Sequence, residues 1–449
     1  MNKNLDKNGD LKLPALFLMG GALFSMHFGA SSMVWPMNWG KESGSSVFGA
    51  FCGAFITALL LTLLAYVALS RGNGTYNHIT TRVLGKRLGE SYTMLTIVVL
   101  GPLYAIPRMS AASWDSIVQA FGLNPQAKLP LIIFTVVFYL ITYWFLMSPG
   151  KTMDRISSIL FPLLIIIVTI VVGKGLMMPI AKPVAQTYEG SAFAYGFTNG
   201  YATAEILCSL IFGVVILNGL KAKGVSDERM SKNIIRIGII GIALLSCTHL
   251  CHMLIGASTG GTIDLNYTAL YTAVATKLLG RLGGILFSFA LFFAALTTAI
   301  GMTSGCAEFF VDTTEGKVDY KTASIAVLIF STIFGCMGLA SILAFLGPIL
   351  DGIYPAAIVL VIYYALMPNN QNKRHLNVCR YAMITALIFG IFDTIYAYGN
   401  KLNLDLGYFN IFYEGLPLSS EMLAWFPWTV VAAIIGYLVY QKSEVAVAS

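Results

Sequence analysis

Charged residues are scarce in this 449-residue chain. They make up 11% of the residues, whereas hydrophobic residues make up 57% and the mean hydropathy is +0.75. So few charges cannot cover the surface of an ordinary soluble domain, and the composition therefore indicates a lipid bilayer as the solvent. The sequence also lacks a nucleophile and base, or metal-binding acids, gathered at one depth, so it does not predict an enzyme.

Cysteine is present but gives no disulfide framework. The seven cysteines are odd in number and lie in apolar segments or near their ends, which argues against structural pairing. The segment "CTHLCH" at 247–252 places two thiols and two imidazoles on about one and a half helical turns, a pattern that a soft metal could use. No acid or further ligand pair completes a shell, so packing and interhelical hydrogen bonding are the favoured interpretation.

Apolar segments of about 20 residues recur along the whole chain, and each is long enough to cross a bilayer as a helix. They leave no room for a soluble domain, and the first one is long and contains a proline, so we expect it to be retained rather than cleaved as a signal. The sequence predicts an all-α polytopic membrane protein with about twelve spans, near 13–38, 46–70, 91–121, 129–148, 153–175, 191–219, 234–256, 277–305, 322–337, 341–367, 378–398 and 422–441.

Positive charge sets the expected orientation. If the N-terminus is cytoplasmic and the chain crosses twelve times, 20 of the 28 Lys and Arg residues fall in cytoplasmic segments, as the positive-inside rule requires. We therefore expect a multi-pass protein of the plasma (inner) membrane with both termini in the cytoplasm. The net charge of +7 is then a topology signal, and no nucleic-acid partner is expected.

Two spans contain polar, helix-breaking residues. The first carries Gly29, Ser31, Ser32 and Pro36, and the sixth carries the segment 196–200, with Gly196, Thr198 and Asn199, before Glu205. Close helix packing explains small residues in either span alone. Two breaks in equivalent spans, the first starting inside and the sixth outside, predict inverted five-helix repeats (1–190 and 191–370), with two further helices in 371–449, and a binding site at the breaks.

A threonine pair in the eighth span is a candidate cation site. Thr297 and Thr298 follow Ala294 by one turn, so two hydroxyls approach the carbonyl of Ala294. Hard cations take oxygen ligands, and carbonyls of the broken first span near Phe24 and His27 could complete the set. The alternative is that both hydroxyls bond to their own helix.

The third span reads "GPLYAIPRMSAASWDS" at 101–116, with a charge in a membrane segment. An intramembrane ionisable residue is by default a candidate functional residue. Arg108 could contact a substrate, pair with Asp115 on the same face, or bond to loose carbonyls near Pro102 or in a neighbouring broken helix.

That segment resembles the signature of the branched-chain amino acid:cation symporters (LIVCS, BrnQ-type carriers). "FGASSMVWP", "GYATAEILCSLIFG" and "LTTAIGMTSGCAEFF" are similar to the same family's first, sixth and eighth spans. The resemblance implies a secondary active transporter, not an enzyme, with the five-plus-five fold of LeuT-like transporters, which imports leucine, isoleucine and valine by sodium symport and needs no cofactor. The chain departs from the family pattern at His27, at Ser31 and Ser32, and at Glu205.

A zwitterionic substrate requires fixed dipoles in place of its lost hydration. We expect backbone N–H groups around Ala30, Ser31, Ser32 and Met33 to bind the carboxylate, and carbonyls from Tyr195 to Thr198, beside Asn199, to accept from the ammonium. A channel, or a divalent-metal carrier of the same fold, fits the breaks less well. The alternative that stays open is a proton-coupled carrier of another neutral amino acid or amine.

Overall fold

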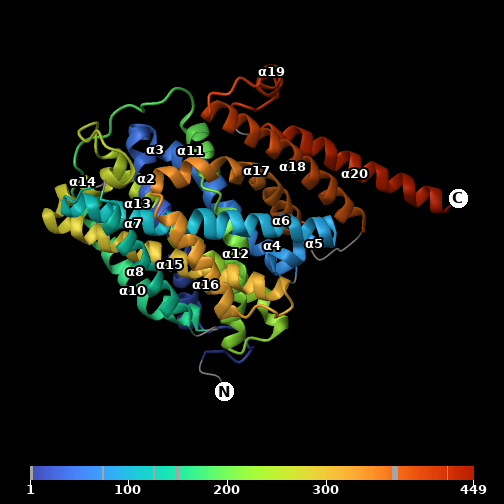
Figure 1. Cartoon of the computed structure of the whole chain (residues 1–449), viewed down its shortest axis with the longest axis horizontal. Coiled ribbons are helices and arrows are strands. Elements are labelled where there is room, and N and C mark those ends of the chain that lie inside the picture. Colours follow the sequence, from blue (N-terminus) through green and yellow to red (C-terminus); the bar gives the residue numbers. More distant parts are fainter. Residues whose placement is uncertain are drawn as a thin grey trace.

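The computed structural model describes residues 4–72, 75–124, 127–147, 151–366, 373–421 and 423–448. The ends of three predicted spans, at residues 148, 367 and 422, lie outside these ranges. The described chain is helical throughout and has no β-strand in those ranges beyond an isolated bridge between Leu5 and Leu11. The N-terminus lies at one end of the molecule, and α3, α11 and α19 lie at the opposite end (Figure 1).

The helices of the first part of the chain, in order, are α1 (Leu13–His27), α2 (Ala30–Ser43), α3 (Val47–Ala54), α4 (Leu61–Arg71), α5 (Tyr76–Leu84), α6 (Lys86–Val98), α7 (Ile106–Phe121), α8 (Lys128–Leu146), α9 (Thr152–Arg155) and α10 (Phe161–Met177). Those of the second part are α11 (Ala192–Tyr201), α12 (Glu205–Ala222), α13 (Asp227–Ala257), α14 (Tyr267–Leu279), α15 (Arg281–Thr313), α16 (Tyr320–Gly335), α17 (Leu339–Leu366), α18 (Lys373–Lys401), α19 (Tyr408–Glu414) and α20 (Trp425–Ala448). Short 3₁₀ or π segments connect some of them: η1 (Gly44–Ser46), η2 (Phe55–Leu60), η3 (Val99–Ala105) and η4 (Ile156–Leu160).

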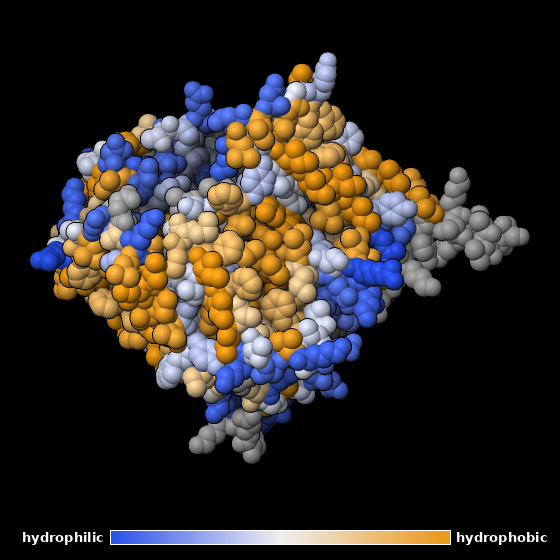
Figure 2. Space-filling model, viewed as in Figure 1, coloured by the Kyte–Doolittle hydropathy of each residue, from blue (hydrophilic) through white to orange (hydrophobic). Residues whose placement is uncertain are grey.

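Nine helices or continuous helical runs in the described ranges are long and apolar enough to cross a membrane, by length and composition. Three shorter apolar helices, Leu13–His27, Tyr320–Gly335 and Trp425–Val439, fall on further predicted spans. The outer surface agrees with a lipid environment, since α8 exposes Ile133, Leu140 and Trp144 and apolar residues spread across the middle of the face in Figure 2.

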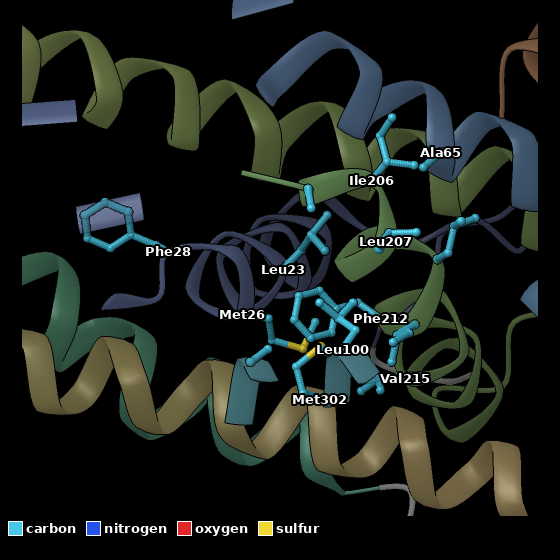
Figure 3. Close-up of a cluster of buried hydrophobic side chains, with 14 of the residues drawn as sticks. Leu23, Met26, Phe28, Ala65, Leu100, Ile206, Leu207, Phe212, Val215 and Met302 are labelled. Carbon is cyan, nitrogen blue, oxygen red and sulfur yellow. The ribbon is translucent and has the colours of Figure 1, made fainter. Parts of the chain in front are cut away.

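The core of the molecule is built around the first, sixth and eighth spans. Helices α1, α12 and α15 contact one another, and α13 packs along both α1 and α2. In Figure 3, Leu23 and Met26 of α1 lie against Leu207 and Phe212 of α12, with Met302 of α15 beside them. The broken first and sixth spans are thus central elements and not peripheral ones.

The prolines of "GPLYAIPR" have a local consequence. Pro102 lies inside the π-helical segment η3, and Pro107 occupies the first turn of α7. A proline has no N–H to donate and clashes with the preceding turn, so a wider π turn accommodates it. Arg108 directly follows Pro107 in the first turn of α7, and its guanidinium lies over the ring of Trp35 on α2.

Candidate functional site

The first span is interrupted at two residues. Helix α1 ends at His27, Phe28 and Gly29 are non-helical, and α2 begins at Ala30. The N–H of Phe28 donates to the carbonyl of Phe24 across 2.7 Å, and the N–H of Gly29 donates to that of His27 across 2.8 Å. No side chain caps α2, so the amides of its first turn have no intrahelical partner. Helix N-termini of this kind are favourable for anions.

The space at Gly29 is tightly restricted. An added Cβ would lie 2.6 Å from Oγ1 of Thr298 and 3.3 Å from the sulfur of Met109. The backbone of Gly29 is extended, with φ −81°, so glycine is needed here for close approach to α15 and not for conformation.

The sixth span is also interrupted, but the predicted position was wrong. Helix α11 continues from Ala192 to Tyr201, and the break lies at residues 202–204, where Ala204 has a left-handed φ of 55°. Gly196 does not break the helix. Its role is to let α11 pack closely on α3, since an added Cβ would lie 1.8 Å from the carbonyl oxygen of Ala50. The chain turns instead just before Glu205, the first residue of α12.

The carbonyls expected to accept from an ammonium group are occupied. The carbonyl of Tyr195 accepts from the side chain of Asn199, that of Thr198 accepts from the N–H of Ala202, and that of Phe197 accepts from Thr57 Oγ1. Gly196 packs on α3, and the hydroxyl of Tyr195 donates to Glu42 of α2. The described lining of the cavity beside α2 does not include Tyr195, Gly196, Thr198 or Asn199.

Side chains join the two breaks directly. Nδ1 of His27, the last residue of α1, lies 2.8 Å from Oε2 of Glu205, and Oγ of Ser32 donates to Oε1 of Glu205 across 3.0 Å. The other ring nitrogen of His27 is 2.7 Å from the hydroxyl of Tyr66 on α4. All of these groups are buried. Through His27 and Ser32, Glu205 connects the C-terminal end of α1 and the first turn of α2 to the N-terminal end of α12.

The threonine pair of α15 meets the end of α1. Thr297 Oγ1 donates to the carbonyls of Ser25 (2.6 Å) and Ala294 (2.8 Å), and Thr298 Oγ1 donates to the carbonyl of Met26 (2.7 Å). Five neutral oxygens thus lie together, a donor set that suits a hard monovalent cation better than a divalent one, which prefers carboxylates. The alternative that the threonines bond only to their own helix is wrong.

The positions expected from α1 differ from those observed. The carbonyls of Phe24 and His27 are engaged within the break, whereas Ser25 and Met26 face Thr297 and Thr298. Helical spacing alone does not identify the two carbonyls that face a neighbouring helix, because this depends on how α1 is rotated against α15.

Arg108 lines a cavity of about 320 Å³ between α2, α7 and α14, together with Ala30, Ser31, Trp35 and Asp115. Its guanidinium carbon lies 5.5 Å from the ring centre of Trp35 and 4.6 Å from that of Tyr104, whose hydroxyl accepts from Nη1 at 3.0 Å. Its Nε is buried and has no hydrogen-bond partner among the described residues. Met33, by contrast, is fully buried in the core.

The expected alternatives for Arg108 can now be separated. The structure describes both Arg108 and Asp115, and no ion pair joins them. Asp115 instead accepts a hydrogen bond from Gln119 across 3.1 Å. An unpaired guanidinium that is only 9% exposed is costly, and stacking on Trp35 offsets part of that cost. The cavity that Arg108 lines thus carries both a positive and a negative side chain.

The "CTHLCH" segment divides between two faces of α13. His249 and His252 are buried, and His252 bonds to Tyr271 at 2.8 Å, whereas Cys247 is exposed. The described residues include no group of three or more His, Cys, Asp or Glu side chains placed to hold a metal ion.

These features define a class of protein. A bundle of apolar helices in which two broken members meet at its centre, beside a cavity and a cluster of neutral oxygens, is an architecture of secondary transporters. The chain matches the family described as "Branched-chain amino acid transport protein" over residues 13–443 and belongs to that family. Its relatives are permeases and carriers, and it is a transporter of this family and not an enzyme.

Relatives are similar along most of the chain. The chain is 31% identical to the "Branched-chain amino acid permease BraB" of Bacillus subtilis over 94% of both chains. It is 30% identical to the "Branched-chain amino acid transport system 2 carrier protein" of Pseudomonas aeruginosa, over 91% of this chain and 92% of that one. Its fold is similar to that of MHP1, a nucleobase-cation-symport-1 family transporter in a closed conformation, with a TM-score of 0.57, 13% identity and coverage of 94% and 93%.

Proposed function

We propose that the protein imports leucine, isoleucine or valine together with sodium by alternating access. The observation that carries this proposal is the contact of the broken first span with α15, where Thr297 and Thr298 meet the carbonyls of Ser25 and Met26. In this proposal sodium binds among these oxygens and Ala294, and so connects α1 to α15. At a membrane potential of 100 mV, each accompanying sodium contributes about 2.3 kcal/mol from voltage alone.

The substrate is proposed to bind in the cavity beside α2. The free amides of Ala30, Ser31 and Ser32 and the guanidinium of Arg108 favour its carboxylate. Because the carbonyls of α11 are occupied, the ammonium group is assigned to Asp115, the anionic side chain among the described residues that line this cavity, directly or through water. Val34, Ala112 and Leu339 supply apolar walls for an aliphatic side chain.

The proposed arrangement in the membrane follows the positive charges. Both termini are placed in the cytoplasm of a cell whose plasma (inner) membrane the chain crosses about twelve times. Residues 1–190 and 191–370 are assigned to two inverted five-helix repeats, and 371–449 to two appended helices. The equivalent breaks at 28–29 and 202–204 support this division.

Uptake by purified protein in liposomes tests the proposal. Labelled leucine, isoleucine, valine, alanine and phenylalanine are offered under an inward sodium gradient, an inward proton gradient, or neither. We expect accumulation of the three branched-chain substrates with the sodium gradient only. Flux at channel-like rates without any gradient would contradict a carrier.

The alternative is a proton-coupled carrier of another neutral amino acid or amine. The feature that favours it is the buried contact between His27 and Glu205, where two groups that can each hold a proton meet beside the breaks. Uptake that follows the proton gradient and ignores sodium in the same experiment would select this alternative.

A further inference from the structure

Glu205 lies between the two places where the proposed ligands bind. Its Oε2 contacts His27, which directly follows the carbonyls of Ser25 and Met26 at the proposed cation site. Its Oε1 accepts from Ser32 in the first turn of α2, where the substrate carboxylate is assigned. One carboxylate therefore holds both sides of the break in the first span.

The position of Glu205 is fixed by its own helix and by a second contact layer. It begins α12, directly after the left-handed Ala204, and its backbone carbonyl accepts from Ser209 Oγ at 3.1 Å. His27 in turn is held by Tyr66 of α4, and its ring packs edge-on to Phe212 at 5.0 Å. The end of α1 and the start of α2 are thus both held against one helix, α12, and not only against each other.

Stability alone does not explain a buried carboxylate at this position. Glu205 is 9% exposed, and burying an ion is costly even when hydrogen bonds compensate it. Replacing buried ionic groups with apolar ones is often neutral or stabilising, so its presence calls for a role beyond stability. Its contacts with both halves of the first span supply one.

We propose that Glu205 is the positioning residue that couples sodium binding to substrate binding, a role that rests on the proposed function. Sodium that fixes the end of α1 thereby fixes His27, and through Glu205 it fixes Ser32 and the amides that receive the carboxylate. Free energy is transferred between the two sites because both ligands favour the same arrangement of this contact. Without the contact, the direct side-chain link between the end of α1 and the first turn of α2 is lost, and Phe28, Gly29 and the helices packed on both parts, α13 and α15, remain to join them.

Binding of labelled L-leucine to the purified full-length protein in detergent tests this role. Affinity is measured with saturating sodium and with choline in its place, for the wild type, Glu205→Leu and Ser32→Ala. Ser32→Ala removes one hydroxyl and keeps the backbone amide, so it serves even if Glu205→Leu does not fold. Glu205→Asp keeps the carboxylate, and Glu308→Gln, an acid on α15 that lines a different cavity, is the matched control.

We expect sodium to strengthen leucine binding about fivefold or more in the wild type and in Glu308→Gln, which is within the usual range of coupling. In Glu205→Leu and Ser32→Ala the ratio should fall below about twofold, and Glu205→Asp should restore part of it. By reciprocity, leucine should likewise stop changing the affinity for sodium.

The outcomes separate the two proposals. A wild type without any sodium effect on leucine binding would overturn the sodium-coupled function itself. A wild type with the effect, and variants that bind leucine more weakly but keep the full sodium ratio, would show that Glu205 has a structural role only and would overturn this inference.

Discussion

The hydroxyl of Thr298 donates to the carbonyl of Met26 across 2.7 Å, so a residue of α15 holds the last turn of α1 just before the chain unwinds. Thr297 and Thr298 together bring into contact oxygens from two spans that are about 270 residues apart in the sequence.

Replacement of Thr297 and Thr298 by valine keeps their shape and removes two oxygens from the proposed cation site. The affinity for sodium, measured from the sodium dependence of leucine uptake, should fall tenfold or more, since a lost ligand to a cation costs on the order of 1.5–3 kcal/mol. Thr303→Val is the matched control, because this threonine is on the same helix and its buried hydroxyl has no partner in the part of the chain that the structure describes. Unchanged sodium dependence in a well-folded double variant would assign the pair a structural role.

His27→Phe should destabilise the protein, because it leaves one oxygen of the buried Glu205 carboxylate without the partner that His27 provides, while Ser32 still donates to the other. Loss of a buried hydrogen bond to a charged group costs about 1.5–3 kcal/mol, which should appear as a fall in melting temperature in detergent. Glu205→Leu combined with His27→Phe removes both polar groups and should be more stable than His27→Phe alone. If the single variant melts like the wild type, the two side chains do not depend on each other.

Gly29→Ala should impair transport by displacing Thr298. The added Cβ would lie 2.6 Å from Thr298 Oγ1, and overpacking of this kind costs about 1–3 kcal/mol. We expect weaker sodium dependence and slower leucine uptake. Gly173→Ala on α10 is the control, since the nearest atom to its added Cβ is 4.0 Å away, and it should transport normally. Equal uptake by both variants would show that the break accommodates a methyl group at position 29 and would contradict this prediction.

Asp10 should give the N-terminal segment a pH-dependent stability. The hydrogen bond from Lys232 and the positive charge of that residue hold the pKa of Asp10 below its usual range, with contributions from Asn233 and Arg229. A lowered pKa means that the contact stabilises the folded state above the ordinary pKa of about 3.9 and is lost as the pH falls through the lower folded value.

Asp10→Asn should therefore lower the free energy of unfolding at pH 7 by on the order of 1.5–3 kcal/mol, the contribution of a hydrogen bond to a charged group. The loss is measured as a fall in melting temperature. The variant's difference from the wild type should shrink toward zero as the pH falls below the ordinary pKa and through the lower folded pKa of Asp10. Asp264→Asn is the control, because Asp264 is fully exposed and 3.9 Å from Lys41, and such surface pairs contribute little. A difference that is the same at both pH values would mean that the charge of Asp10 does not matter.

The sequence by itself determined the membrane class, the helical fold and the existence of two breaks. These follow from local properties: the length of apolar runs, the scarcity of charge, and small or polar residues where lipid offers backbone groups no partner. The same reasoning placed Thr297, Thr298, Ala294, Ser31 and Arg108 among the candidates, since hydroxyls and an intramembrane charge stand out at any position in a span.

Only the tertiary structure decided which of these residues meet. Gly196 to Gly200 looked like a break, but packing on α3 keeps α11 helical and moves the break to 202–204. Because of the way α1 is rotated, the carbonyls of Ser25 and Met26 face α15, and not those of Phe24 and His27. Because α12 packs against the end of α1, His27 contacts Glu205. A helix turns by about 100° per residue, so a sequence specifies the faces of each helix, while the direction in which a face points is fixed only by the side chains packed against it.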